Sequence, residues 1–246
     1  MHPTNSLRAV LRAAAAELIG TGALVLAVVG SGIAASRLSP SDAGLQLLEN
    51  SIATALALAV LILVFAPVSG AHFNPVVTAV DAIGAARTRA GAGRALLVIG
   101  AQIIGAIGGA LLANALFEVP AALSTTERGG AGAWLAEVVA TAGLVLVIGA
   151  LVRTGRTAHA PWAVGAYIGA AYWFTSSTSF ANPAVTIGRM FSDTFAGIAP
   201  TSVLPFLAAQ IIGAAIGALL ARLLFVQPAP ASTTMRADGL ASHTRP

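Results

Sequence analysis

Long apolar runs separated by short polar segments dominate this chain. Two of the apolar stretches, residues 72–83 and 181–191, are too short to cross a bilayer, and each contains an Asn-Pro pair. Non-helical backbone at membrane depth is tolerated only inside protein or along a cavity. We therefore predict an all-α membrane protein with six transmembrane helices and two re-entrant half-helices. The six runs of about 20 residues, long enough to span, are 12–35, 47–67, 94–117, 132–152, 159–178 and 203–226.

The two halves of the chain repeat one another. The hexapeptide 101–106 recurs letter for letter as 209–214, and in both halves its glutamine lies 28 residues after the asparagine of the Asn-Pro pair. Each repeat, 12–117 and 132–227, contains three spans, so the two repeats must insert with opposite orientations. Such inverted repeats with broken helices place a permeation or binding site near the bilayer midplane.

Composition supports a membrane location. Of the 246 residues, 57% are hydrophobic and 9% are charged, whereas soluble domains carry about 25% charged residues. There is no cysteine, which excludes a disulfide framework and a thiolate metal site. All thirteen basic residues are arginines scattered between apolar runs, which argues against a nucleic-acid partner.

The arginines also predict the orientation, because positive residues are enriched in cytoplasmic loops. With both termini cytoplasmic, ten arginines lie inside and three outside. The inside set is Arg8, Arg12, Arg87, Arg89, Arg94, Arg153, Arg156, Arg222, Arg236 and Arg245, and the outside set is Arg37, Arg128 and Arg189. We expect a multi-pass protein of a bacterial-type inner (plasma) membrane, with a cytoplasmic N-terminus (1–11), a channel domain (12–227) and a disordered cytoplasmic tail (228–246).

The Asn-Pro pairs, Asn74-Pro75 and Asn182-Pro183, have a specific physical meaning. Proline suits the first position of a helix, and asparagine before it is a good N-cap. Two such half-helices entering from opposite faces would bring two amide donors and two positive helix ends to the midplane. That arrangement favours a neutral, oxygen-bearing permeant and repels cations.

Residues 69–78 (SGAHFNPVVT) and 179–184 (SFANPA) resemble the two signature loops of the aquaporin, or major intrinsic protein, family. Glu17 with Gly20-Thr21 matches as well, and the resemblance covers about residues 12–227. It implies a homotetramer with one pore per subunit that passes water or small uncharged solutes through the bilayer. Val76 stands where the family usually has alanine, the residue found at Ala184 in the second loop; we expect this change to affect packing and not mechanism.

The same resemblance locates an outer selectivity filter. In the family an arginine normally follows the second Asn-Pro-Ala, but here that position is Val185. The other filter positions fall on Thr54, Ala170 and Ser179, with Gly169 or Ile168 as alternatives to Ala170. We expect a wide, weakly polar, uncharged ring that admits solutes larger than water.

This set of filter residues is similar to that of bacterial aquaglyceroporin-like channels, in which Thr and Val occupy the first and last filter positions. That resemblance implies permeation of arsenite and related neutral metalloid hydroxides. Glycerol, urea and ammonia fit the same ring almost as well, and the sequence leaves the choice open.

Four further residues have more than one interpretation. Intramembrane carboxylates usually indicate function, but the symmetric placement of Glu17 and Glu137 favours a structural role, accepting N–H groups from the re-entrant loops. His72 would line the inner mouth or anchor its loop. Arg189 lies one helical turn beyond Val185, on roughly the same face, and either adds charge at the outer vestibule or caps a helix.

A second hypothesis is an ion- or proton-coupled secondary transporter, since those also use inverted repeats. Coupling needs titratable groups in the pathway, and only the two glutamates offer themselves. The sequence contains no catalytic constellation, metal-ligand cluster or phosphate loop, so we expect neither enzyme activity nor a cofactor. The expected partners are the lipid bilayer, other copies of the chain and small neutral solutes.

Overall fold

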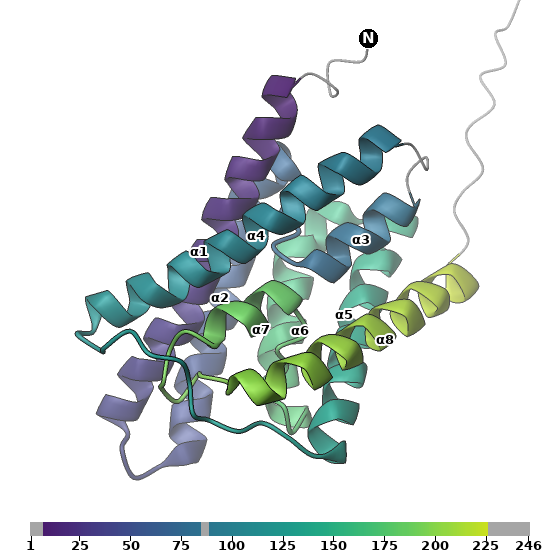
Figure 1. Ribbon diagram of the computed structural model, residues 1–246. Helices are drawn as coiled ribbons and strands as arrows, with labels where there is room; N and C mark the ends of the chain where they lie inside the picture. The colour runs from purple at the N-terminus through teal and green to yellow at the C-terminus, as the bar shows by residue number, and fades with distance from the viewer. Residues whose placement is uncertain (1–6, 85–88, 226–246) are drawn as a thin grey trace, which may run out of the picture.

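The computed structural model describes residues 7–84 and 89–225, and every regular element in these ranges is a helix (Figure 1). Five helices are long and apolar enough to cross a membrane. They are α1 (Leu7–Leu38), α2 (Ala43–Ser69), α4 (Arg89–Leu116), α5 (Ala131–Arg153) and α8 (Pro200–Leu224). A sixth, α6 (Ala160–Phe174), has 15 residues and follows a single 3-10 turn at Thr157–His159. The prediction of six spanning segments and two half-helices is confirmed, although α6 ends four residues earlier than the predicted span.

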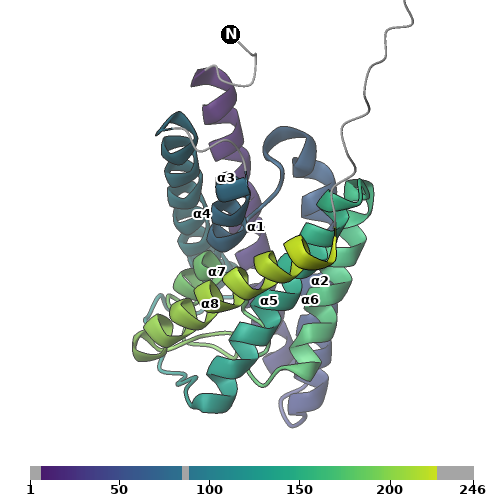
Figure 2. The same cartoon turned by 90° about the vertical axis from the view of Figure 1, so that its right-hand side faces the viewer.

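The two half-helices, α3 (Pro75–Gly84) and α7 (Pro183–Arg189), both begin at the proline of an Asn-Pro pair. Their caps form as the residue types dictate. Asn182 Oδ1 accepts the backbone N–H groups of Ala184 and Val185, and Asn74 Oδ1 accepts that of Val76. The half-helices lie between α4 and α8, and each contacts both of them (Figures 1 and 2).

Equivalent helices pack in equivalent pairs, α1 on α4 in the first repeat and α5 on α8 in the second. Glycine makes both approaches possible. A Cβ atom at Gly109 would lie 2.1 Å from the carbonyl oxygen of Gly22, and one at Gly217 would lie 2.3 Å from that of Ala142. Small residues that let backbones approach this closely are typical of helix packing in membranes.

The distribution of apolar and polar side chains is that of a lipid-embedded protein. Large apolar residues are exposed on the outer faces of the long helices, for example Leu63, Ile104 and Leu204, while polar residues such as Glu17 and Gln102 are buried. In water such a surface would be strongly unfavourable. The predicted tail (228–246) lies outside the described residues, as do Arg87, Arg236 and Arg245.

Candidate permeation site

The two signature loops meet at the centre of the protein and are bonded to each other. Asn74 Nδ2 donates to the carbonyl oxygen of Ala181 at 2.8 Å, and Asn182 Nδ2 donates to that of Phe73 at 2.7 Å. Each asparagine amide has two N–H groups, and this bond uses one of them. Both asparagines also line a common cavity, so the second N–H is available to a molecule inside it.

Both loops adopt the same unusual backbone conformation just before the asparagine. The residues three and one positions before it have positive φ angles, 52° at Ala71 and 50° at Phe73, and 51° at Ser179 and 48° at Ala181. Residues other than glycine rarely adopt this region. Such conformations persist only where the surrounding structure holds them in place.

The two buried glutamates hold these loops. Glu17 accepts the backbone N–H groups of His72 and Phe73, at 2.9 and 2.6 Å. Glu137 accepts those of Phe180 and Ala181, both at 2.9 Å. These are the structural contacts that the symmetry of the two glutamates predicted.

A glutamine extends each network toward the half-helix. Gln102 Nε2 donates to Glu17 at 2.7 Å and to Thr78 at 2.9 Å. In the second repeat Gln210 Nε2 donates to Glu137 at 2.6 Å, and it also donates to Thr186. The shared hexapeptide thus places the same amide in both networks.

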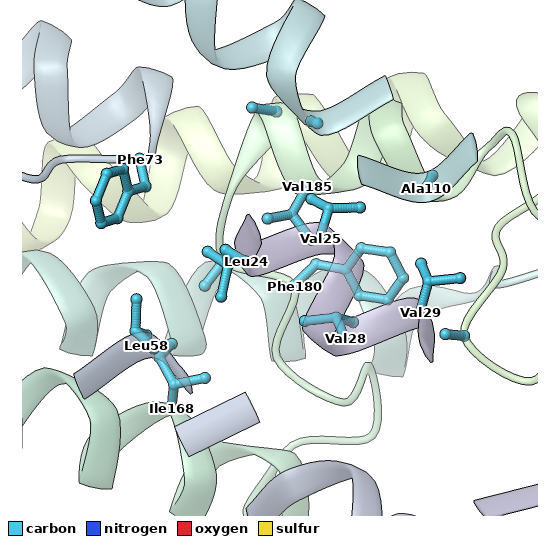
Figure 3. Packing of buried hydrophobic residues seen from close by; sticks show 14 of the residues in the cluster. Leu24, Val25, Val28, Val29, Leu58, Phe73, Ala110, Ile168, Phe180 and Val185 are labelled. Carbon is cyan, nitrogen blue, oxygen red and sulfur yellow. The ribbon is translucent and has the colours of Figure 1, made fainter. Parts of the chain in front are cut away.

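The cavity between the loops and the long helices has a volume of about 110 Å³ and is elongated. Along α6 its wall runs from Ala160 to Tyr172, which corresponds to about 18 Å of helix rise. Most of the wall is apolar, with residues from α1, α2, α5 and α6. Figure 3 shows three of them, Leu24, Leu58 and Ile168, together with the loop residues Phe73 and Phe180. His72 contributes to this wall, and its ring Nδ1 lies 3.2 Å from Thr78 Oγ1. It therefore both lines the cavity and contacts its own half-helix.

Three of the four residues predicted for the outer filter, Thr54, Ser179 and Val185, line the cavity. For the fourth position the alternative prediction, Ile168, lines the cavity, whereas the first choice, Ala170, does not. Ala170 is exposed on the outer surface of α6, and the cavity is lined instead by Ile168 and Tyr172. Because each residue turns a helix by about 100°, Ile168 and Tyr172 share a face and Ala170, midway between them, points away.

The cavity is also lined by a charged and an aromatic side chain, in addition to the residues predicted for the ring. Arg189 is 2% exposed, and it lines the cavity together with Tyr172. Its guanidinium carbon lies 3.5 Å from the ring centroid of Phe180, and its Nε donates to the carbonyl oxygen of Ala196. The Tyr172 hydroxyl lies 3.2 Å from that of Thr54. Reasoning from the sequence missed Tyr172; its signal was its position one turn after Ile168.

A helical inverted repeat that encloses an elongated cavity, with two asparagine amides at its centre, defines a membrane channel. Comparison with known proteins gives the family. The Major intrinsic protein family model matches residues 4–180. The chain is 49% identical over 219 residues to Aquaglyceroporin AqpS of Rhizobium meliloti (strain 1021), covering 89% of this chain and 91% of that one. It is 32% identical over 228 residues to Aquaporin TIP1-1 of Arabidopsis thaliana, covering 88% of each chain.

Among solved structures, the aquaglyceroporin from Plasmodium falciparum shares the fold, with a TM-score of 0.63 at 22% identity over 86% of this chain and 93% of that chain. The chain belongs to the major intrinsic protein family, whose aquaglyceroporins are channels and not enzymes. The resemblance of its signature loops to that family is confirmed.

Proposed function

We propose that this protein is a passive channel for water and small neutral solutes, including glycerol-like polyols and neutral metalloid hydroxides such as arsenite. The observation that carries the proposal is that Asn74 and Asn182 line one common cavity, whose wall is otherwise mostly apolar. A few placed polar groups on an apolar wall give orientation without tight binding, which is what rapid passage requires.

The asparagine amides supply the polar contacts at the centre. Each retains an N–H group after bonding the opposite loop, and an N–H donor suits the oxygen of water, a polyol or a metalloid hydroxide. The same donors cannot replace the hydration shell of a cation, which needs oxygen ligands. Passage of neutral, oxygen-bearing solutes is therefore favoured over passage of ions.

The substrate range is proposed from the outer end of the cavity. Val185, Ser179 and Ile168 are small or medium side chains that line the cavity beside the larger Tyr172 and Arg189, and we infer that the three smaller side chains leave room for solutes larger than water. The name of the relative at 49% identity, an aquaglyceroporin, agrees with polyol passage. Arsenious acid is uncharged at neutral pH and presents hydroxyl groups much as glycerol does.

We further propose a homotetramer in a bacterial-type plasma membrane, with both termini in the cytoplasm. The arginine asymmetry supports this orientation. The exposed apolar side chains of α2 and α6, such as Leu56 and Trp162, provide surfaces for lipid or for neighbouring copies.

The coupled-transporter hypothesis is less well supported. A coupling group must load and release an ion, whereas Glu17 and Glu137 both accept backbone N–H groups that hold the loops in place. Protonating either carboxylate would weaken those bonds.

Reconstitution into liposomes tests the proposal. Under inward gradients of glycerol, urea or neutral arsenite, vesicles containing the protein should shrink and re-swell faster than protein-free vesicles, with flux linear in the gradient. Uptake that saturates at low concentration, or that requires a pH gradient, would contradict a channel. The substitution Val185→Arg should suppress glycerol and arsenite flux while water flow persists; unchanged solute flux would remove Val185 from the constriction.

A further inference from the structure

Arg189, the last residue of α7, is a buried cation with an unusual set of contacts. Its guanidinium stacks on Phe180 and its Nε donates to Ala196. Among the described residues no carboxylate lies within ion-pair distance of it. An unpaired buried charge is costly, so its presence in the cavity wall calls for a role that the fold alone does not supply.

The side chain is held rigidly, yet most of its donors remain available. A guanidinium carries five N–H groups, and the bond to Ala196 uses the one on Nε. The Phe180 ring, whose centroid lies 3.5 Å from the guanidinium carbon, also restricts the group. Since Arg189 lines the cavity, its terminal nitrogens form a preorganised donor site there.

The position of this charge follows from helix geometry. Side chains on a helix lean toward its N-terminus and cover the preceding turn. Arg189 lies four residues after Val185 on α7, and both residues line the cavity. Width and charge at this end of the cavity come from two residues, Val185 for width and Arg189 for charge.

Oxygen groups complete the site. Ser179 Oγ is buried, lines the cavity and has no hydrogen-bond partner. The paired hydroxyls of Thr54 and Tyr172 lie in the same wall. A neutral solute with two hydroxyls can accept a bond from Arg189 and exchange another with Ser179, whereas a cation meets a fixed positive charge.

We propose that Arg189 is the specificity-determining residue of the outer constriction: it repels cations and orients hydroxylated solutes, while Val185 sets the width. This inference rests on the proposed channel function. It assigns charge selection and size selection to different side chains, so the two should be separable by mutation.

The primary test compares Arg189→Leu with Arg128→Leu in liposomes. Arg128 is a matched control because it also contacts Phe180, at 5.2 Å, and also binds the 190–199 segment through the carbonyl oxygens of Gly197 and Phe195, but it lies outside the cavity wall. Removing the charge of Arg189 should raise cation or proton leak by about tenfold or more and leave water flow within about twofold. Arg128→Leu should leave the leak at the wild-type level.

A second variant tests whether a leak in Arg189→Leu comes from the lost charge or from a loosened loop. The exchange Val185→Arg with Arg189→Val moves the charge one turn inward; it should restore low cation leak while cutting glycerol flux. Equal leak in Arg189→Leu and Arg128→Leu, or no rise in either, would overturn the inference and leave the channel proposal standing. Wild-type vesicles that pass glycerol no faster than empty ones would overturn both.

Discussion

The two signature loops can be compared position by position. In both, a serine five residues before the asparagine contacts the buried glutamate, Ser69 in one and Ser177 in the other. The two residues before the asparagine donate their backbone N–H groups to the same carboxylate. The positive φ angles fall at the same three positions, four, three and one residues before the asparagine. The centre of the channel is thus symmetric in chemistry as well as in fold.

The loops diverge after the proline. The first half-helix continues for ten residues to Gly84, whereas the second ends after seven at Arg189. The segment after Arg189 is bonded to the loop between α4 and α5, because Thr125 donates both its backbone N–H and its hydroxyl to Asp193. These bonds hold the pKa of the Asp193 carboxyl below its usual value. The two loops are therefore alike in the contacts that hold them at the centre of the protein, and they differ in the segment that follows each half-helix.

The largest effect on stability should come from removing the buried glutamates that hold the two symmetric loops. Each of the two carboxylates accepts hydrogen bonds from four donors. Replacing Glu17 or Glu137 with leucine leaves those four donors without their acceptor. Each buried unpaired donor costs about 1–3 kcal/mol, so the sum rivals a typical total stability of about 5–15 kcal/mol. Neither variant should yield monodisperse protein by size-exclusion chromatography in detergent. The isosteric Glu→Gln changes, which keep one acceptor oxygen, should fold with lowered thermal stability; full stability of either leucine variant would refute the scaffold role.

A smaller effect is expected where the helices of each repeat pack together. Gly109→Ala and Gly217→Ala each force a methyl group against a backbone carbonyl, and overpacking costs about 1–3 kcal/mol. Gly108 is an adjacent control, since a Cβ atom there meets nothing within 4 Å. Gly108→Ala should be neutral or should stabilise by up to about 1 kcal/mol. Thermal unfolding of the three variants checks this ranking; equal loss at Gly108 and Gly109 would contradict it.

The smallest effect on stability should follow from replacing Val76 with alanine, the residue that the second signature has at the same position, Ala184. Val76 packs against Val145 and Ala214 and does not line the cavity wall. Val76→Ala should therefore cost about 1–2 kcal/mol of stability and leave solute flux unchanged. The reverse change, Ala184→Val, enters a fully buried site and should cost more. Altered selectivity in Val76→Ala, measured by glycerol and water flux, would show that this position acts on the pore.

Much of this architecture could be predicted because it depends on local sequence. Apolar length fixes a spanning helix, an Asn-Pro pair fixes a helix start, and a hexapeptide at one offset reveals the repeat. The structural role of Glu17 and Glu137 followed from their symmetry. Each of these inferences needs only residue types and distances along the chain.

The outer constriction could not be predicted in the same way. The predicted filter position on α6 was obtained by counting residues back from Asn182 through an irregular loop. Because each residue turns a helix by about 100°, an error of one residue in this count selects a different face of α6. That is why Ala170 was expected where Ile168 and Tyr172 lie. For Arg189 the sequence left a vestibule role and a capping role open, because it does not contain the contacts with Phe180 and Ala196 that hold the side chain at the cavity wall.

The sequence by itself thus determined the class of protein and the centre of its channel, because helix length, capping and repetition are local properties. Only the tertiary structure shows that Arg189 is buried and lines the same cavity as Val185. Its guanidinium is held by Phe180 and Ala196, nine and seven residues away along the chain, and only the folded loops bring these groups into contact.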